Sequence, residues 1–160
     1  MRKIAAVLCL CLCLGALCAC GQQEQIPQEY LDALTAEPKE PVAWNVTLTA
    51  QTVSASGGTF LFAQSETVPD GQFLTGRSFA IEQKNGEKWD IYSFVEGAEL
   101  EYNAEAVSIP IGGTVSWTVD WTNLYGTLPA GEYRLVKPVM LIGEAGEDTR
   151  LVYAEFTLNS

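Results

Sequence analysis

A short stretch of alternating residues in the C-terminal third constrains the fold more than any other feature of the sequence. Its apolar positions are Val115, Trp117, Val119 and Trp121, with polar residues between them. This period of two predicts a β-strand with one apolar and one polar face. Because two of the apolar residues are indoles, each with roughly 150–250 Å² of surface to bury, that face requires a second layer of structure. The stretch therefore predicts a layered β protein.

The residues after this strand predict a corner and a returning strand. Asn123 and Gly126 interrupt the alternation. Gly131 then stands two residues before Tyr133, at the start of another apolar run. This arrangement matches the tyrosine corner of immunoglobulin-like sandwiches, in which the tyrosine hydroxyl bonds back to the corner backbone. The alternative is that Tyr133 is an ordinary half-buried strand residue.

Residues 117–137 carry the pattern W-x-x-x-W…L-x-x-G-x-Y-R-x-x-K. They resemble a bacterial immunoglobulin-like domain family found in exported proteins and lipoproteins of Gram-positive bacteria. The likeness extends to the hairpin between Phe79 and Trp89, and to the whole of residues 41–160. The resemblance implies an all-β, immunoglobulin-like β-sandwich of about seven antiparallel strands, but no shared activity and no shared site.

The N-terminus has the organisation of a secretory signal. Arg2 and Lys3 precede an uncharged, largely apolar run from Ile4 to Cys18. A helix of that length reaches roughly 22 Å, which is shorter than the ~30 Å hydrocarbon core of a membrane. A charged start with a short apolar run therefore predicts a signal peptide and not a membrane-spanning helix.

The end of that run, Leu17-Cys18-Ala19-Cys20 followed by Gly21, resembles the lipobox of bacterial lipoproteins, although Cys18 is unusual at its position. The resemblance implies that the Cys20 sulfur is acylated before cleavage ahead of it. No cysteine follows Cys20, so we expect no disulfide in the mature domain. Several acyl chains, palmitate among them, would hold the protein on the extracytoplasmic face of the cell membrane. Ordinary secretion after cleavage at a nearby small residue is the alternative.

Three parts of the chain follow from these features. We expect a lipoprotein signal peptide over residues 1–19, the lipidated Cys20 and a flexible tether over 20–41, and one sandwich domain over 42–160. The tether is rich in Gln, Glu and Pro, and would average about 25 Å end to end as a coil. Within it, residues 27–34 predict a short helix with Pro27 first and a weak apolar edge. Tyr30, Leu31 and Leu34 make that edge.

Other strands are expected where apolar and polar residues alternate. These are residues 44–49, a strand starting at Phe60, the two arms of a hairpin around Asn85-Gly86, residues 107–111, and a final hairpin ending near Leu158. Asn-Gly between two alternating runs is the strongest short hairpin signal. Residues 65–76 and 96–105 are predicted to be long connections.

The charge and the missing residue types exclude several functions. The chain has nine basic and twenty acidic residues, a net charge of −11, which is poorly suited to nucleic acid or to an anionic lipid surface. Solubility explains this acidity, and a basic protein partner or bound cations are the alternatives. The chain has no His and no thiol after Cys20, which removes the usual bases, thiol catalysis and ordinary zinc sites.

Two groups of carboxylates remain as candidates for catalysis or for Ca²⁺. They are Glu99 with Glu101, and Glu144 with Glu147 and Asp148. Both groups fall on predicted loops without an apolar pocket to raise a carboxyl pKa, and neither has the spacing of known calcium loops. We therefore expect no enzyme activity and no cofactor, and leave Ca²⁺ binding open.

Aromatic residues are the remaining candidates for a site. Trp89, Trp117 and Trp121 fall on inward phases of their strands, so with Gly131 and Tyr133 they are expected to define the fold. Trp121 and Tyr125 flank the corner and are predicted to be partly exposed at one end of the sandwich, where Trp and Tyr favour protein contacts. The expected function is binding to another envelope or extracellular protein. A small-ligand or carbohydrate module, a protease-inhibitor-like domain and a structural spacer are the alternatives.

Overall fold

Two antiparallel sheets account for most of the described chain in a computed structural model of the protein. The structure describes residues 44–65, 71–98, 105–144 and 146–160. The predicted signal peptide, the acylated Cys20, the tether and its helix lie outside these residues, as do Glu99 and Glu101. Within the described ranges, no helix has the length and apolar character that a membrane crossing requires.

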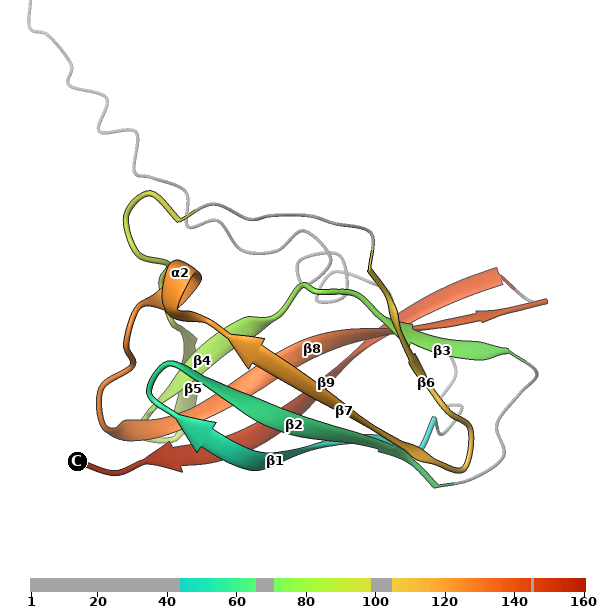
Figure 1. The fold of residues 1–160 in the computed structure, drawn as a ribbon, viewed down its shortest axis with the longest axis horizontal. Coiled ribbons are helices and arrows are strands. Elements are labelled where there is room, and N and C mark those ends of the chain that lie inside the picture. The colour runs from blue at the N-terminus through green and yellow to red at the C-terminus, as the bar shows by residue number, and fades with distance from the viewer. Residues whose placement is uncertain (1–43, 66–70, 99–104, 145) are drawn as a thin grey trace, which may run out of the picture.

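The smaller sheet has the order β1-β2-β7 and is formed by the most regular alternation in the sequence (Figure 1). Its strands are β1 (Val46–Ser54), β2 (Gly57–Gln64) and β7 (Thr114–Asp120). Because successive side chains point to opposite faces, one face of each strand is apolar. Phe60 and Phe62 of β2 are fully buried, and Leu48 and Trp117 lie beside them in the core.

The larger sheet is organised around one long strand. β8 (Gly131–Gly143) pairs along its whole length with β9 (Gly146–Leu158). On the other side of β8, β4 (Ala80–Asn85) pairs with its first half and β3 (Gln72–Thr75) with its second half. β5 (Lys88–Ile91) extends the sheet from β4, and β6 (Val107–Ile109) extends it from β3.

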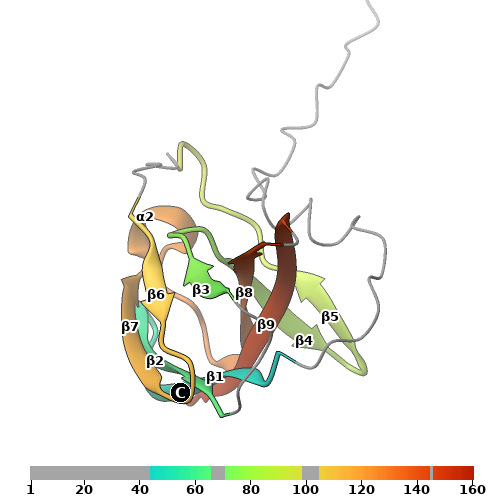
Figure 2. The same ribbon diagram turned by 90° about the vertical axis from the view of Figure 1, so that its right-hand side faces the viewer.

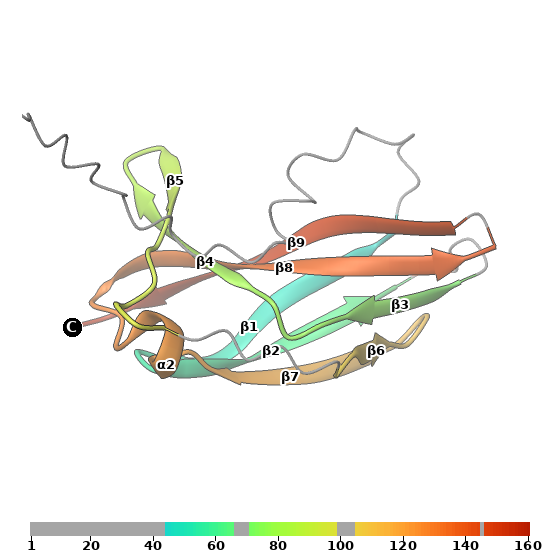
Figure 3. The ribbon, with the colours of Figure 1, turned by 90° about the horizontal axis from the view of Figure 1, so that it is seen from above.

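The two sheets face each other as the two layers of a sandwich (Figure 2). At one side β6 lies between β3 and β7, and at the other β1 lies beside β9. The β4–β5 hairpin projects away from the smaller sheet (Figure 3). Aromatic rings fill the space between the layers, including Trp121 stacked on Phe156 at 5.8 Å and Phe156 stacked on Tyr133 at 5.7 Å between ring centroids. The predicted immunoglobulin-like β-sandwich is confirmed.

The tyrosine corner is present. The Tyr133 hydroxyl donates a hydrogen bond to the Pro129 carbonyl oxygen at 3.0 Å, and Tyr133 is fully buried. A side chain at Gly131 would stand 3.1 Å from the Tyr133 ring, so glycine lets the ring pack against the backbone at the corner. Burial raises the pKa of the Tyr133 hydroxyl, with a smaller contribution from Tyr92.

A buried lysine fills the gap where β3 and β4 separate along β8. The Lys137 side chain is fully buried, and its Nζ atom lies 4.5 Å from the centroid of the Trp117 ring. The ammonium group donates hydrogen bonds to the carbonyl oxygens of Gly76 and Ser78, the latter at 2.7 Å. Because residues 76–79 do not pair with β8, the lysine supplies the donors that a strand would otherwise provide.

The order of elements differs from the sequence prediction in three places. Nine strands are described instead of about seven, and one of them, β3, lies inside the predicted connection 65–76. β3 has only four residues, too few for a clear alternation. Glu147 and Asp148 belong to β9 and not to a loop, since the final hairpin turns between Gly143 and Gly146. A single helical turn, α2 (Thr122–Tyr125), follows β7 at the corner.

Candidate functional site

The predicted partner surface at the corner is wrong, because both of its residues are buried. Trp121 is 0% and Tyr125 is 3% exposed. The Trp121 indole N–H donates to the Ala55 carbonyl oxygen at 3.0 Å. Tyr125 is turned into the core by α2, and its hydroxyl accepts the backbone N–H of Ile81 at 3.1 Å. Each polar tip is thus satisfied inside the protein, so neither aromatic is available to a partner.

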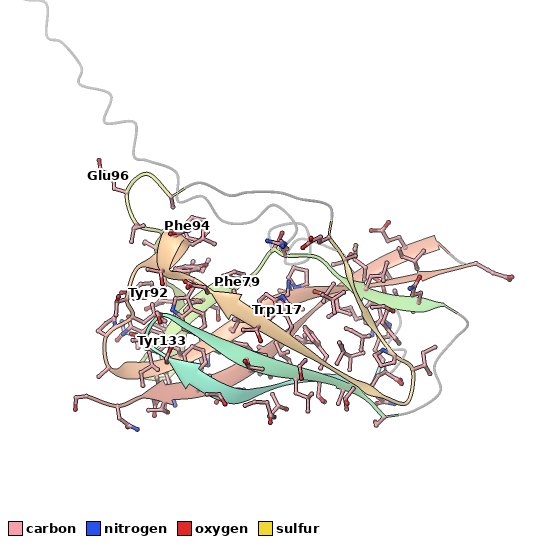
Figure 4. The ribbon with its side chains drawn as sticks, in the orientation of Figure 1. Phe79, Tyr92, Phe94, Glu96, Trp117 and Tyr133 are labelled. Atoms are coloured by element: carbon pink, nitrogen blue, oxygen red, sulfur yellow. The ribbon has the colours of Figure 1, made fainter. Side chains whose placement is uncertain are left out.

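The segment after β5 covers this end of the sandwich. The rings of Tyr92 and Phe94 lie 6.3 and 4.8 Å from that of Tyr125. The Val95 N–H donates to the Leu124 carbonyl oxygen at 2.8 Å, which fixes the segment to α2. Figure 4 shows Tyr92 and Phe94 at the same end of the sandwich as Tyr133, with Phe79 and Trp117 nearer its middle. The apolar phase changes after Ile91, and the alternation Tyr92-Ser93-Phe94 in the new phase was the signal for this cover.

A different surface gathers Trp, Tyr and Arg at the outer side of the larger sheet. Arg134 of β8 lies between two aromatic residues, with its Cζ atom 4.8 Å from the ring centroid of Trp89 on β5 and 5.1 Å from that of Tyr153 on β9. Tyr153 is 56% exposed, and the Arg134 side chain is 24% exposed. Three strands therefore contribute to one row of stacked planar groups that faces away from the core.

Ion pairs hold this row in place. Arg134 pairs with Glu82 of β4, whose side chain is only 6% exposed. Beside it, Lys84 Nζ lies 2.8 Å from Glu132 Oε2 and 5.8 Å from the Trp89 ring centroid. The hydrogen bond to Glu132 raises the pKa of Lys84. Carboxylates of neighbouring strands thus orient both cations. The position of each cation relative to the Trp89 ring is therefore fixed.

An apolar floor continues the row along the sheet. Ala80 and Val136 are 1% and 3% exposed, and Ile91 and Leu151 pack against them as a cluster separate from the main core. We call the combined surface the Arg134 face. Its members are Ala80, Glu82, Lys84, Trp89, Ile91, Glu132, Arg134, Val136, Leu151 and Tyr153.

Trp89 is on this face and not in the core, so its predicted role as a core aromatic is wrong. In the β4–β5 hairpin Trp89 pairs with Lys84. Residues directly opposite each other in an antiparallel pair share a face, and Lys84 has the opposite phase to the buried Ile81. The pairing of β4 with β8 places Ile81 inward, and Trp89 is consequently outward.

The carboxylate groups considered for chemistry are not assembled into a site among the described residues. Asp148 lies 3.2 Å from Arg150 on the same strand, and Glu144 is exposed in the turn. Over residues 44–65, 71–98, 105–144 and 146–160, no group of three or more His, Cys, Asp or Glu residues is placed to hold a metal ion.

Comparison with protein families identifies one to which the chain is similar. The model of a family described as bacterial Ig-like domain matches residues 40–157, which is more than half of the chain. The match begins ahead of β1 and ends within the last residues of β9, so it includes the β-sandwich and the Arg134 face. No curated protein matches the chain.

Proposed function

The chain belongs to the bacterial Ig-like domain family, and from this premise we propose that it binds another protein of the cell envelope or its surroundings through the Arg134 face. Membership indicates an extracellular protein-interaction or structural module of a typically non-catalytic kind. A non-enzymatic function also agrees with the absence of His from the whole chain. The proposal goes further by assigning binding to one sheet face.

The row of Trp89, Arg134 and Tyr153 carries this proposal. Trp, Tyr and Arg are the residues most enriched among those that dominate binding free energy at protein interfaces. Their side chains are already stacked and paired in the free protein, which reduces the conformational entropy lost on binding. The row therefore has both the composition and the order that a binding surface requires.

We also propose that the protein is a lipoprotein anchored through Cys20 outside the cell membrane. The support is the charged start, the short apolar run and the lipobox-like end of residues 1–20. Fractionation of cells that express the full chain and its Cys20→Ser variant tests the anchor. The wild type is expected in the membrane fraction and the variant in the medium or soluble fraction. Membrane retention of the variant at the wild-type level would contradict the anchor.

The binding proposal is tested by photo-crosslinking and pull-down from the native envelope with the full chain. Tyr153→Ser removes an exposed ring and is expected to reduce capture of a specific partner at least 10-fold, with an unchanged fold. Leu61→Ser is the matched control, because Leu61 is a partly exposed apolar residue on the outer face of the smaller sheet. Equal capture by both variants and the wild type would exclude the Arg134 face as the binding surface. Loss of binding to a glycan through Tyr153, with no protein captured, would instead favour the carbohydrate-binding alternative.

A further inference from the structure

We propose that the outer edge of β5 is a self-association site, at which two copies of the chain join their larger sheets as an antiparallel pair. The site consists of the backbone groups that this edge presents and of the two charged side chains beside them. It is independent of partner binding through the Arg134 face, because those side chains lie on the other side of the strand.

β5 is the end strand that the rest of the described sandwich leaves uncovered. The other end strands have neighbours in the opposite sheet, since β1 lies beside β9 and β6 lies between β3 and β7. β5 belongs instead to the hairpin that projects away from the smaller sheet, and among the described residues it pairs with β4 alone (Figure 3). An uncovered edge strand presents a row of backbone groups with which another strand can pair.

The backbone groups of Trp89 and Ile91 are directed away from β4. Tyr92 donates its N–H to the Ile81 carbonyl oxygen at 2.8 Å, so the backbone of Tyr92 is directed toward β4. Because this direction alternates along an antiparallel strand, Trp89 and Ile91 each present one N–H and one carbonyl group to the outer edge. A further strand can therefore pair there without any change in the existing hairpin.

The side chains of β5 place opposite charges on the two sides of Trp89. Lys88 and Asp90 flank it in the sequence, and both are exposed. In an antiparallel pair of two β5 strands centred on Trp89, Lys88 of each copy stands directly opposite Asp90 of the other. Opposite charges at such positions stabilise the pair, and like charges destabilise it. A register that paired Trp89 with Ile91 would place Asp90 opposite Asp90, so the charges select the first register.

Both charged groups can take part in such a pair. Asp90 accepts a hydrogen bond from the Asn85 amide at Oδ2, at 3.2 Å, which leaves its other oxygen for a cation. None of the ion pairs among the described residues involves Lys88. The net charge of −11 opposes association of two chains in general, although salt screens this repulsion over about 8 Å at physiological ionic strength. The order of charges at this edge, and not the overall charge, therefore favours a second copy.

Pairing at β5 would join the two larger sheets into one continuous sheet. Residues directly opposite each other share a face, so both Trp89 rings, and with them both Arg134 faces, would lie on the same side of it. An edge of four residues is too short to bury the roughly 1,200–2,000 Å² of a stable interface, so we expect a weak and reversible dimer. Anchoring of both copies in one membrane through the proposed acylation of Cys20 would favour it by raising their local concentration.

Disulfide formation in cells that express the full chain tests the pairing. Two differently tagged copies are co-expressed, one with Lys88→Cys and the other with Asp90→Cys, and the natural chain has no cysteine after Cys20. We expect a disulfide between the copies, because directly opposed Cβ atoms are about 4.5 Å apart at such a position, the upper end of disulfide geometry. Lys88→Cys in both copies is expected to give at least 5-fold less dimer, because equal positions lie on a diagonal of about 7–8 Å. Equal yields, or a disulfide to another protein instead of the second copy, would overturn the proposal.

Charge reversal is a second test, measured as recovery of one tagged copy with the other from solubilised membranes. Asp90→Lys lowers the net negative charge, so relief of general repulsion alone would raise recovery, whereas pairing at β5 predicts a loss of at least 5-fold. Co-expression of Asp90→Lys with Lys88→Asp recreates both opposite-charge pairs and is expected to restore recovery, which also shows that both variants fold. Glu144→Lys, exposed in the turn of the final hairpin, is the matched control and should leave recovery unchanged. Failure of the mixed pair to restore recovery would overturn the proposal.

One variant separates this inference from the proposed function. Tyr153→Ser is expected to leave both the disulfide yield and the recovery of the second copy unchanged, because Tyr153 lies on the Arg134 face and not at the β5 edge. Loss of partner capture in Tyr153→Ser with normal dimer formation supports both proposals. Normal partner capture together with a charge-dependent dimer would exclude the binding face alone.

Discussion

The two outer faces of this sandwich obey the same alternation rule and yet differ in chemistry. The outer face of the smaller sheet is lined by hydroxyl side chains, namely Thr47, Thr49, Thr59, Thr114, Ser116 and Thr118. Thr59 and Thr118 of neighbouring strands lie 3.0 Å apart through their hydroxyl oxygens. The Arg134 face of the larger sheet carries instead an apolar floor and a row of stacked aromatic and cationic groups.

The outer-face residues of the smaller sheet are those expected for folding alone, whereas the Arg134 face contains residues that the core does not require. The inner faces of both sheets already supply a continuous core from Leu48 to Phe156. A β-branched hydroxyl residue suits the pleated surface and is also compatible with water, which makes the smaller sheet the ordinary case. Exposed Tyr153 and half-buried Trp89 add little to the core, and their position on one face supports the proposed interaction surface.

The largest effect on the free energy of unfolding is expected from substitution of a core tryptophan, compared with a tryptophan on the outer side of the larger sheet. Trp121→Ala removes a fully buried indole that stacks on Phe156 and bonds to Ala55, and is expected to cost about 3–5 kcal/mol of the free energy of unfolding. Trp89→Ala is expected to cost about 1 kcal/mol, because the ring lies outside the core and contributes mainly cation–π contacts. Urea unfolding followed by circular dichroism measures both. Equal losses would show that Trp89 is a core residue after all.

The next comparison is between the stability costs of removing two cations of β8 that point to opposite faces of the sheet. Lys137→Met fills the same space but leaves the Gly76 and Ser78 carbonyl oxygens without their donor, and is expected to cost about 2–4 kcal/mol. Arg134→Met is expected to cost a similar amount, about 2–4 kcal/mol, because it leaves the Glu82 carboxylate, whose side chain is only 6% exposed, without its cation. Denaturant midpoints at pH 7 give both values. A loss below about 1 kcal/mol for Arg134→Met would show that water replaces the guanidinium at Glu82, and that only the buried lysine is needed to hold the sheet.

A smaller effect on stability is expected at the tyrosine corner, where the chain passes from one sheet to the other. Tyr133→Phe removes the bond to Pro129 and is expected to cost about 1 kcal/mol at pH 7. Burial raises the pKa of Tyr133 above its ordinary value near 10, so the unfolded chain loses this proton at a lower pH than the folded protein. Stability is then lost as the pH rises above about 10. The loss between pH 9 and 11 should be smaller in Tyr133→Phe, and identical slopes would exclude this contribution.

Sequence reasoning was strongest where one strand carries its own information. The alternation from Val115 to Trp121 and the glycine before Tyr133 predicted a strand and a corner that the structure contains. The prediction of exposure failed at Trp121 and Tyr125, because their exposure depends on α2, a single turn that no local propensity predicts.

The Arg134 face depends on how strands pair, which alternation within one strand does not specify. A two-residue turn at Gly86 and Glu87 does place Trp89 opposite Lys84, so the outward direction of Trp89 was available from the hairpin signal. The positions of Arg134 and Tyr153 beside Trp89 could not be predicted from the sequence, because they follow from the register of β8 with β4 and β9. A surface assembled from four strands is determined by tertiary pairing.

The smallest expected effect on stability is also the sharpest separation of the two faces. Tyr153→Ser and Thr118→Val each change one exposed outer-face residue and are expected to shift the free energy of unfolding by no more than about 0.5 kcal/mol. Only Tyr153→Ser should impair partner capture, since Thr118 lies on the hydroxyl-lined sheet. Melting curves and the envelope pull-down, run on the same preparations, measure both properties. Impaired capture by Thr118→Val with normal capture by Tyr153→Ser would move the binding surface to the smaller sheet, and the chemical contrast between the faces would then have no bearing on function.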